Sequence, residues 1–313
     1  MKHPPYQLRT NKAIDRLMFV EAIRYLVRPN DEGRFTYYAL GGPYLEDFRL
    51  MHENFPKMHL VSLEHDPETY KQQKFHLPCR RIRLLPLDFR SFLARYDSRD
   101  KKSIFWLDYT GLEYSEVEDF RSLLGKVASG SVIKVTLRAE PSDFLEEEEE
   151  NEFKKKFAAV LPSSNVTLPR DSDELAGLLQ DMVRIAAQQE LPSATGVAYQ
   201  PISSFCYKDG VGIFTLTGIV CSKNEVERTR DLFSKWRFAN LNWATPKRID
   251  VPFLSTKERL HLQRHLPCAN DAGNRLHKIL KYNIDVDREA AIAKMAQYAD
   301  FYSYFPYFMK AIP

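Results

Sequence analysis

Short apolar runs recur along the first two thirds of the chain, and polar residues separate them. The runs are rich in aromatic and β-branched side chains, a pattern typical of strands that are buried in a sheet. The predicted strands are residues 35–40, 58–63, 82–87, 102–108 and 130–137. Segments with apolar residues at helical spacing follow the first two runs. This alternation predicts an α/β fold with a mostly parallel sheet.

Longer helices are predicted where apolar residues keep helical spacing over several turns. These segments are residues 6–27, 44–51, 172–190 and 287–300, together with a helix that ends near residue 75. After residue 190, two further strands are predicted at 199–207 and 211–221. Lys208-Asp209-Gly210 joins them, and an Asp-Gly pair is the signature of a tight antiparallel hairpin. The last strand of the sheet should therefore run antiparallel to its neighbours.

The character of the sequence changes near residue 223, where it becomes more helical and more basic. Between residues 223 and 281 there are 13 Lys or Arg and 6 Asp or Glu, an excess of 13 − 6 = +7. We therefore predict an N-terminal helical lead over 1–33, an α/β domain over 34–222 and a helical, basic region over 223–313. The excess makes nucleic acid a candidate partner through residues 223–281.

The first predicted strand ends abruptly at a turn formed by Gly41, Gly42 and Pro43. Helical spacing resumes at Tyr44, so the order is strand, tight turn and helix. Such a turn directs the free N–H groups of the helix start toward the carboxyl edge of the sheet, where nucleotide-like ligands bind in open α/β folds. Glycines also occur in βα turns that bind nothing, so both interpretations stay open at this stretch.

Three predicted strands in succession are followed by an acidic residue. Glu64 follows the second strand, with Asp66 as an alternative, Asp88 follows the third, and Asp108 ends the fourth. Glu64 lies about twenty residues after the glycine turn, the spacing at which α/β folds place a carboxylate on a ribose. A single acid at a strand end is commonly a helix cap, but three at one sheet edge favour a binding site.

Five β/α units, a helix and a final antiparallel hairpin form the order of elements in class I S-adenosylmethionine-dependent methyltransferases. The chain resembles this Rossmann-like family over residues 34–222. The first motif of the family has the form E/D-x-G-x-G-x-G. Here Gly41 matches one glycine, Pro43 and Leu45 stand at the other two, and Ala39 stands in place of the acid. The first glycine motif is therefore degenerate.

The resemblance implies S-adenosylmethionine as cofactor and gives roles to residues at the strand ends. It places Gly41, Gly42 and Pro43 at the cofactor and Glu64, or else Asp66, on its ribose hydroxyls. It also places Asp88 and Phe89 near its adenine, and it puts Asp108 and Tyr109 at the motif after the fourth strand.

Methyl transfer from a sulfonium is an in-line displacement, so the protein mainly aligns the reactants and excludes water. Asp108 could accept a proton or a hydrogen bond from the acceptor, and Tyr109 could stack on a planar substrate. Methyltransferases that act on base amino groups carry D/N-P-P-Y/F at this motif. Asp108 to Gly111 lacks both prolines, so we do not infer a base-flipping enzyme.

Composition excludes several other classes. The four cysteines have no metal-ligand spacing, and no apolar run is long enough for a membrane span, so we expect neither a metal site nor membrane insertion and expect a cytoplasmic protein. The methyl acceptor and the oligomeric state cannot be read from the sequence. The main function predicted is methyl transfer. The alternative is a non-catalytic module of the same fold that binds a nucleotide, a nucleic acid or a protein partner.

Overall fold

The computed structural model describes residues 9–96, 101–268 and 270–306, and the chain divides into two compact units. The larger one, here called the sheet unit, holds residues 19–206 and 211–247. The smaller one, the helical unit, holds residues 1–18, 207–210 and 248–313. The domain limits expected after residues 33 and 222 stay a prediction. The basic segment 223–281 is divided between the two units, so its charge excess does not belong to one of them alone.

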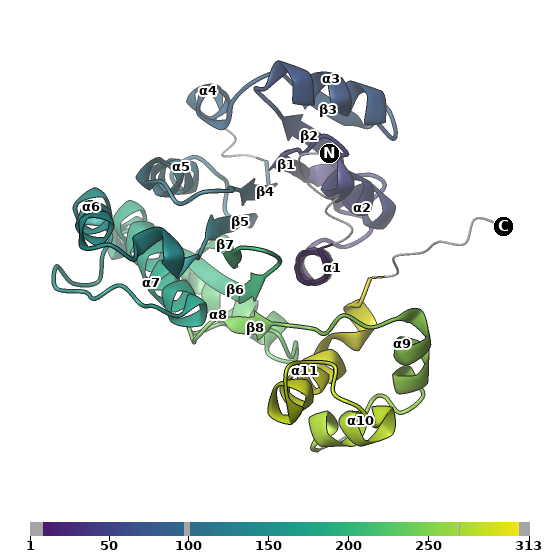
Figure 1. Cartoon of the computed structure of the whole chain (residues 1–313). Coiled ribbons are helices and arrows are strands. Elements are labelled where there is room, and N and C mark those ends of the chain that lie inside the picture. Colours follow the sequence, from purple (N-terminus) through teal and green to yellow (C-terminus); the bar gives the residue numbers. More distant parts are fainter. Residues whose placement is uncertain (1–8, 97–100, 269, 307–313) are drawn as a thin grey trace. The chain divides into compact units, whose positions relative to one another are not determined.

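The described strands form one eight-stranded sheet in the order β3-β2-β1-β4-β5-β7-β6-β8 (Figure 1). Five of them run parallel, and β7 pairs antiparallel with β5. A connection of only three residues joins β6 to β7, so these neighbours also run antiparallel. The predicted α/β fold with an antiparallel last strand is confirmed. The strands are β1 Thr36–Leu40, β2 His59–Leu63, β3 Ile82–Leu85, β4 Ser103–Asp108, β5 Ser131–Arg138, β6 Val197–Lys208, β7 Gly212–Ser222 and β8 Lys247–Ile249.

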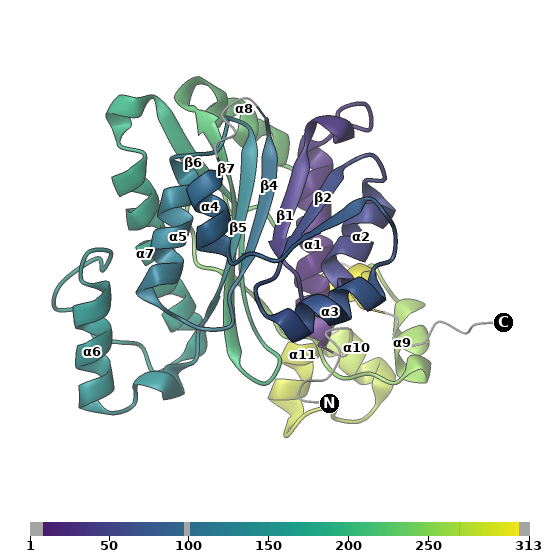
Figure 2. The same cartoon turned by 90° about the horizontal axis from the view of Figure 1, so that it is seen from above.

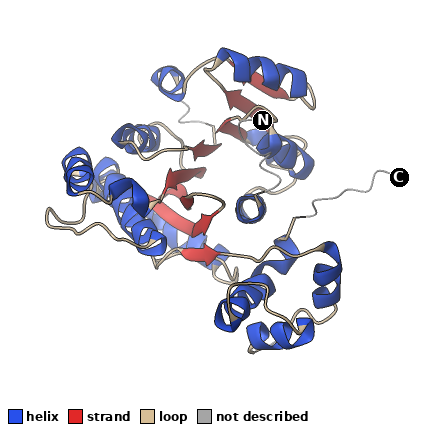
Figure 3. Ribbon diagram, in the orientation of Figure 1, coloured by secondary structure: helices blue, strands red, loops and turns tan. Residues whose placement is uncertain are grey.

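Helices alternate with the strands of the sheet unit (Figure 3). They are α2 Glu46–Asn54, α3 Pro67–His76, α4 Phe89–Arg95, α5 Tyr114–Leu124, α6 Glu147–Phe157, α7 Ser172–Glu190 and α8 Lys223–Phe233. Helix α7 has the bounds that its apolar spacing predicted. The bounds of α4, α5 and α8 were not predicted. The seven residues of α4 are too few to show a period, and α5 and α8 begin at capping boxes formed by Glu113 and Ser222.

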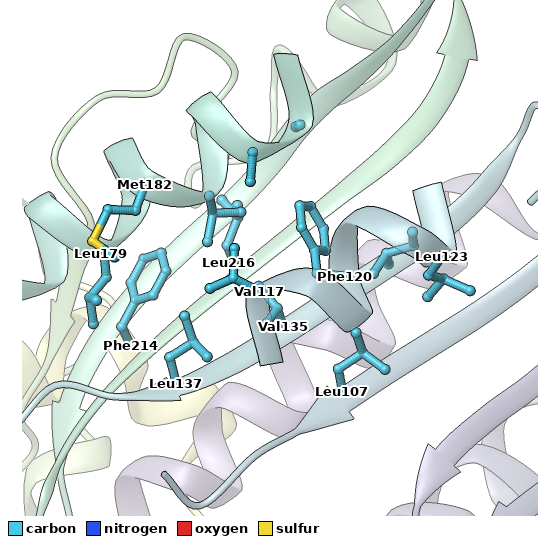
Figure 4. Packing of buried hydrophobic residues seen from close by; sticks show 14 of the residues in the cluster. Leu107, Val117, Phe120, Leu123, Val135, Leu137, Leu179, Met182, Phe214 and Leu216 are labelled. Atoms are coloured by element: carbon cyan, nitrogen blue, oxygen red, sulfur yellow. The ribbon is translucent and has the colours of Figure 1, made fainter. Parts of the chain in front are cut away.

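The main core fills the space between one face of the sheet and helices α5 and α7 (Figure 4). Leu107, Val135, Leu137, Phe214 and Leu216 point from β4, β5 and β7 toward these helices. Val117, Phe120, Leu123, Leu179 and Met182 meet them from the helices. Burying such side chains contributes roughly 1.5 to 3 kcal/mol each. This packing fixes the positions of the central strands and therefore of their carboxyl ends.

The opposite face of the central strands is covered by the second half of α1 (Thr10–Leu26). The ring of Phe19 lies 5.3 Å from that of Trp106, edge to face. Lys134 is buried between them, with Nζ 4.4 Å from the Trp106 ring centre and 5.1 Å from that of Phe19. A cation over two aromatic faces recovers part of the cost of removing the charge from water.

The helical unit is built on α9 (Thr256–Gln263), α10 (Ala272–Leu280) and α11 (Arg288–Phe301). Helices α10 and α11 approach closely at Gly273, where a Cβ atom would lie 2.5 Å from the carbonyl oxygen of Ile292. Arg259 donates a hydrogen bond to the carbonyl of Pro306 at 2.9 Å and lies over the ring of Phe305. Within the described part of the chain, no helix combines the length and the hydropathy needed to span a bilayer.

Candidate active site

The register of the sheet brings the predicted site residues to one edge. Leu40, the last residue of β1, is paired with Leu63 of β2, and Leu63 is paired with Leu85 of β3. Because these strands are parallel, the segments that follow them begin at the same edge (Figure 2). Asp108 ends β4 next to Thr136 of β5. The glycine turn and the acidic residues therefore emerge along one edge of the sheet unit.

The glycine turn after β1 is closed by a side chain of helix α3. Gln73, which is fully buried, donates from Nε2 to the carbonyl of Gly41 at 2.5 Å, and Ser62 donates to its Oε1 at 3.2 Å. A Cβ atom on Gly41 would lie 2.1 Å from Oγ of Ser62 and 2.8 Å from Nε2 of Gln73. Position 41 thus has no room for a side chain. The residue of this turn with a left-handed backbone is Leu45, with a φ of 52°.

Glu64 occupies the end of β2 as a partly buried carboxylate. Its side chain is 14% exposed, and Oε1 accepts a hydrogen bond from the backbone N–H of Asp66 at 2.8 Å. Burial raises the pKa of Glu64 above its usual value, and the hydrogen bond from Asp66 opposes that shift. Hydroxyl groups that donate hydrogen bonds would stabilise this partly buried carboxylate, and a ribose would provide such hydroxyls.

Asp66 and Asp88 act as N-caps of the helices that follow them. Asp66 accepts from the N–H of Thr69 at 2.6 Å, and Asp88 accepts from the N–H and the hydroxyl of Ser91 at 2.8 and 2.6 Å. These hydrogen bonds lower the pKa of both carboxyls. Phe89, next to Asp88, is buried, and its ring lies edge to face with Phe105. Cofactor roles for the three residues stay a prediction.

Asp108 and Tyr109 point to opposite faces of the sheet, because successive residues of a strand alternate. Trp106 contacts Phe19 on the α1 face, and Asp108, two residues later, lies on that face. Leu107 belongs to the core on the α5 face, and Tyr109, partly buried, packs against that core. The two predicted catalytic residues are therefore at the same edge without facing each other.

Tyr109 belongs to a polar network that the sequence did not indicate. Its hydroxyl donates to Oδ2 of Asp119 on α5 at 3.1 Å, while Nε of Arg90 on α4 donates to Oδ1 at 3.0 Å. Burial and the neighbouring Asp119 carboxylate raise the pKa of Tyr109 well above its usual value, so the phenol remains a donor. Burial also raises the pKa of Asp119, against the effect of Arg90. The network ties α4, α5 and the end of β4 together.

Glu116, in the first turn of α5, is a second feature that was missed. It accepts from the backbone N–H of Glu113 at 2.9 Å in a capping box. Burial raises the pKa of Glu116 from its ordinary value of 4.5 to about 7. A Cβ atom on Gly111 would lie 3.4 Å from Oε1 of Glu116, so this carboxyl borders the loop after Tyr109. A carboxyl that titrates near neutral pH suits general base catalysis. In the sequence, the three-residue spacing of Glu113 and Glu116 was the available indication of a capping box.

The family of the chain follows from its sequence as a whole. Residues 4–313 match a protein family described as "Putative O-methyltransferase". The chain belongs to this family. The predicted methyltransferase family is thereby confirmed, and membership implies S-adenosylmethionine as the methyl donor. Among curated proteins, none matches the sequence significantly.

Solved structures resemble this O-methyltransferase family member at low identity. Trm1 from Pyrococcus horikoshii with S-adenosyl-L-methionine has a TM-score of 0.47 and 15% identity, over 71% of this chain and 57% of that one. TYW2 from the same organism in complex with MeSAdo has a TM-score of 0.37 and 13% identity, over 64% of this chain and 61% of that one. A DUF574 family protein from Streptomyces avermitilis has a TM-score of 0.39 and 13% identity, over 66% of this chain and 82% of that one. The chain thus spans about three fifths of the length of both P. horikoshii proteins.

The residues of this family member fit S-adenosylmethionine better at the end of β2 than at the end of β1. Glu64 offers a partly buried carboxylate with a second oxygen for hydroxyl donors. At β1, Ser62 and Gln73 fill the space beside Gly41, while Gly42 and Pro43 stay half-buried. Among the residues that the structure describes, no group of three or more His, Cys, Asp or Glu could hold a metal ion.

Proposed function

We propose that this chain transfers the methyl group of S-adenosylmethionine to an oxygen atom of an acceptor at the carboxyl edge of β1 to β4. The observation that supports the proposal most is the match of residues 4–313 to the O-methyltransferase family. The parallel order of β1 to β4 adds to it, because it gathers the candidate binding and proton-accepting groups at one edge.

The cofactor side of the proposed site rests on Glu64. Its carboxylate would accept hydrogen bonds from the two ribose hydroxyls, while Gly42 and Pro43 would border the cofactor at the neighbouring turn. The predicted position of the adenine is beside Asp88 and Phe89, after the end of β3, where the Phe89 ring itself packs in the core. When bound, S-adenosylmethionine would supply a methyl group activated by its sulfonium: the acceptor oxygen would bond to the methyl carbon in line with the carbon–sulfur bond that breaks, and S-adenosylhomocysteine would leave.

The acceptor side needs a group that removes the proton of a hydroxyl. Asp108 is the predicted group, since it ends the central strand β4 at the proposed site. Glu116 is the alternative, because its pKa of about 7 leaves a substantial carboxylate fraction at neutral pH. Tyr109 would act as a hydrogen-bond donor, because its raised pKa keeps the phenol protonated.

Isothermal titration with S-adenosylmethionine and S-adenosylhomocysteine tests the proposal. A methyltransferase should bind both molecules, with a Kd on the order of micromolar and about −8 kcal/mol of binding free energy. Adenosine triphosphate serves as a control ligand that shares the adenosine but lacks the sulfur-linked amino acid of both compounds. Binding of neither sulfur compound by folded protein would favour the alternative, a non-catalytic module of the same fold.

A further inference from the structure

Three aromatic side chains form a continuous cluster where helix α3 ends. The ring centres of Tyr44 and His76 are 5.0 Å apart, and those of His76 and Phe75 are 5.1 Å apart at an angle of 88°. Arg49 holds the base of the cluster, donating to the carbonyl of His76 at 2.6 Å and to that of Tyr44 at 3.3 Å. All four residues belong to the sheet unit. We call them the Phe75 cluster.

Phe75 is largely exposed to solvent, and the packing of helix α3 does not require that exposure. Its side chain is 85% exposed, although phenylalanine is among the residues most often buried. The other side of the helix already meets the protein through Gln73, which is fully buried. His76 and Tyr44 are half-buried, so the cluster presents one fully open ring beside two partly open ones.

Basic residues are frequent in the part of the sequence that holds Phe75 and His76. Residues 65–83 contain five Lys or Arg and two Asp or Glu, a net charge of 5 − 2 = +3, which equals that of all 313 residues. Lys74 lies over the ring of Tyr70 at 4.5 Å, and Arg80, Arg81 and Arg83 are exposed. One of the two acids, Glu68, is paired with Lys71 at 2.6 Å.

Simpler roles explain only part of this surface. Lys74 and His76 complement the dipole at the end of α3. Strand β3 is at the edge of the sheet, and the charges of Arg81 and Arg83 would protect that edge from pairing with another chain. Neither role calls for an exposed phenylalanine beside histidine and tyrosine.

We propose that the Phe75 cluster, with Lys74, Arg80 and Arg81, binds single-stranded nucleic acid. Proteins that bind single strands combine aromatic rings, on which bases stack, with cations that follow the phosphates. Both parts are present here within a short stretch of the chain. An acidic peptide would use the cations but would leave Phe75 without a matching planar group, so the rings favour nucleic acid.

The cluster also adjoins the proposed cofactor turn. Tyr44 directly follows Pro43, and Gln73, two residues before Phe75, holds the carbonyl of Gly41. A strand bound at the cluster would therefore pass beside the end of β1. Binding at this surface is a property separate from methyl transfer and does not depend on it.

The test is fluorescence anisotropy with a labelled oligouridine of about 16 nucleotides, the upper end of the site sizes of about 4 to 16 nucleotides known for single-strand-binding folds. Stacking of one base on an aromatic ring is worth about 1 to 3 kcal/mol. Phe75→Ala should therefore weaken binding roughly tenfold, since about 1.4 kcal/mol corresponds to a factor of ten. The matched control is Phe253→Ala, which removes an equally exposed ring, 86% open, from the helical unit and should leave affinity unchanged.

Salt dependence tests the cations separately. Each phosphate contact contributes about 0.7 to the slope of log affinity against log salt for single strands. The double variant Arg80→Ala and Arg81→Ala should therefore flatten the slope by roughly 1.4 if each guanidinium contacts one phosphate. Wild-type melting temperatures for all variants would establish that the exposed substitutions leave the fold intact.

Two results would overturn the proposal. One is absence of binding by wild-type protein at about 50 mM salt, where phosphate contacts are strong. The other is unchanged affinity of folded Phe75→Ala; loss of binding in Lys257→Ala and Arg264→Ala would then move the site to α9. A titration of Phe75→Ala with S-adenosylmethionine keeps this outcome separate from the proposed function, because that affinity should equal the wild-type value.

Discussion

The turns after β1 and β4 differ in what fills them. After β1, the side chains of Ser62 and Gln73 occupy the space beside Gly41 and hold its carbonyl. After β4, a network of Tyr109, Asp119 and Arg90 lies beside Glu116, whose pKa is raised to about 7. The space beside Gly41 is thus taken up by the protein itself, while the cofactor roles of Gly41, Gly42 and Pro43 stay a prediction; groups that can donate or accept a proton gather at the end of β4.

This difference indicates how a methyltransferase fold can work with a degenerate first motif. A glycine in that motif is usually read as space for a ligand, but here the space beside Gly41 belongs to the protein. In the proposed site, the carboxylate of Glu64 would then contribute a larger share of the cofactor's binding free energy.

The largest effect is expected at the acceptor side. If Asp108 removes the acceptor proton, Asp108→Asn should lower turnover about 10²- to 10⁴-fold with little change in cofactor affinity. Glu116→Gln should then stay near the wild-type rate. Formation of S-adenosylhomocysteine in the presence of phenols and alcohols, used as probe acceptors, measures both variants. The reverse ranking would assign the base to Glu116.

Gly41→Ala should destabilise the protein. Its Cβ atom would lie within 3 Å of both Ser62 and Gln73, and overpacking of this kind costs about 1 to 3 kcal/mol. The matched control is Gly177→Ala in α7, where no atom lies within 4 Å and alanine should stabilise the helix by roughly 0.5 to 1 kcal/mol. Urea denaturation of both variants checks the prediction. A neutral Gly41→Ala would mean that this turn is loosely packed.

Glu116→Gln should stabilise the protein at high pH. Because the folded-state pKa is raised from 4.5 to about 7, folded protein keeps a proton that unfolded protein has lost in this window. The stability contributed by wild-type Glu116 therefore falls as the pH rises from 4.5 to 7. The advantage of the variant should grow over this window and then level off, on the order of 1 kcal/mol after allowance for solvent screening. Denaturation at about pH 5 and pH 8 measures it, and equal differences at both would contradict it.

Much of the fold could be predicted because strands and long helices carry periodic patterns. The strands β1 to β7 and helix α7 follow from apolar runs, and the hairpin follows from Asp209-Gly210. Short helices such as α4 lack enough residues to show a period. The domain limits and the role of residues 223–281 stay predictions.

The candidate site was less predictable, because contacts between distant residues decide it. The caps made by Asp66 and Asp88 follow from local sequence, and the sequence allowed that interpretation. The contact of Gln73 with Gly41 joins residues 32 positions apart, and no local pattern indicates it. Asp119 lies on a helix of mixed charge, so nothing singled it out before its partners were known.

We propose that Glu64 replaces the degenerate glycine motif as the main anchor of S-adenosylmethionine. Isothermal titration of wild type, Glu64→Ala and Asp66→Ala tests it most directly. Loss of a hydrogen-bonded carboxylate should cost about 1.5 to 3 kcal/mol in Glu64→Ala, which is roughly a 10- to 150-fold weaker Kd. Asp66→Ala, which removes only a helix cap, should bind as wild type does. Unchanged binding by folded Glu64→Ala, or an equal loss in Asp66→Ala, would contradict the claim.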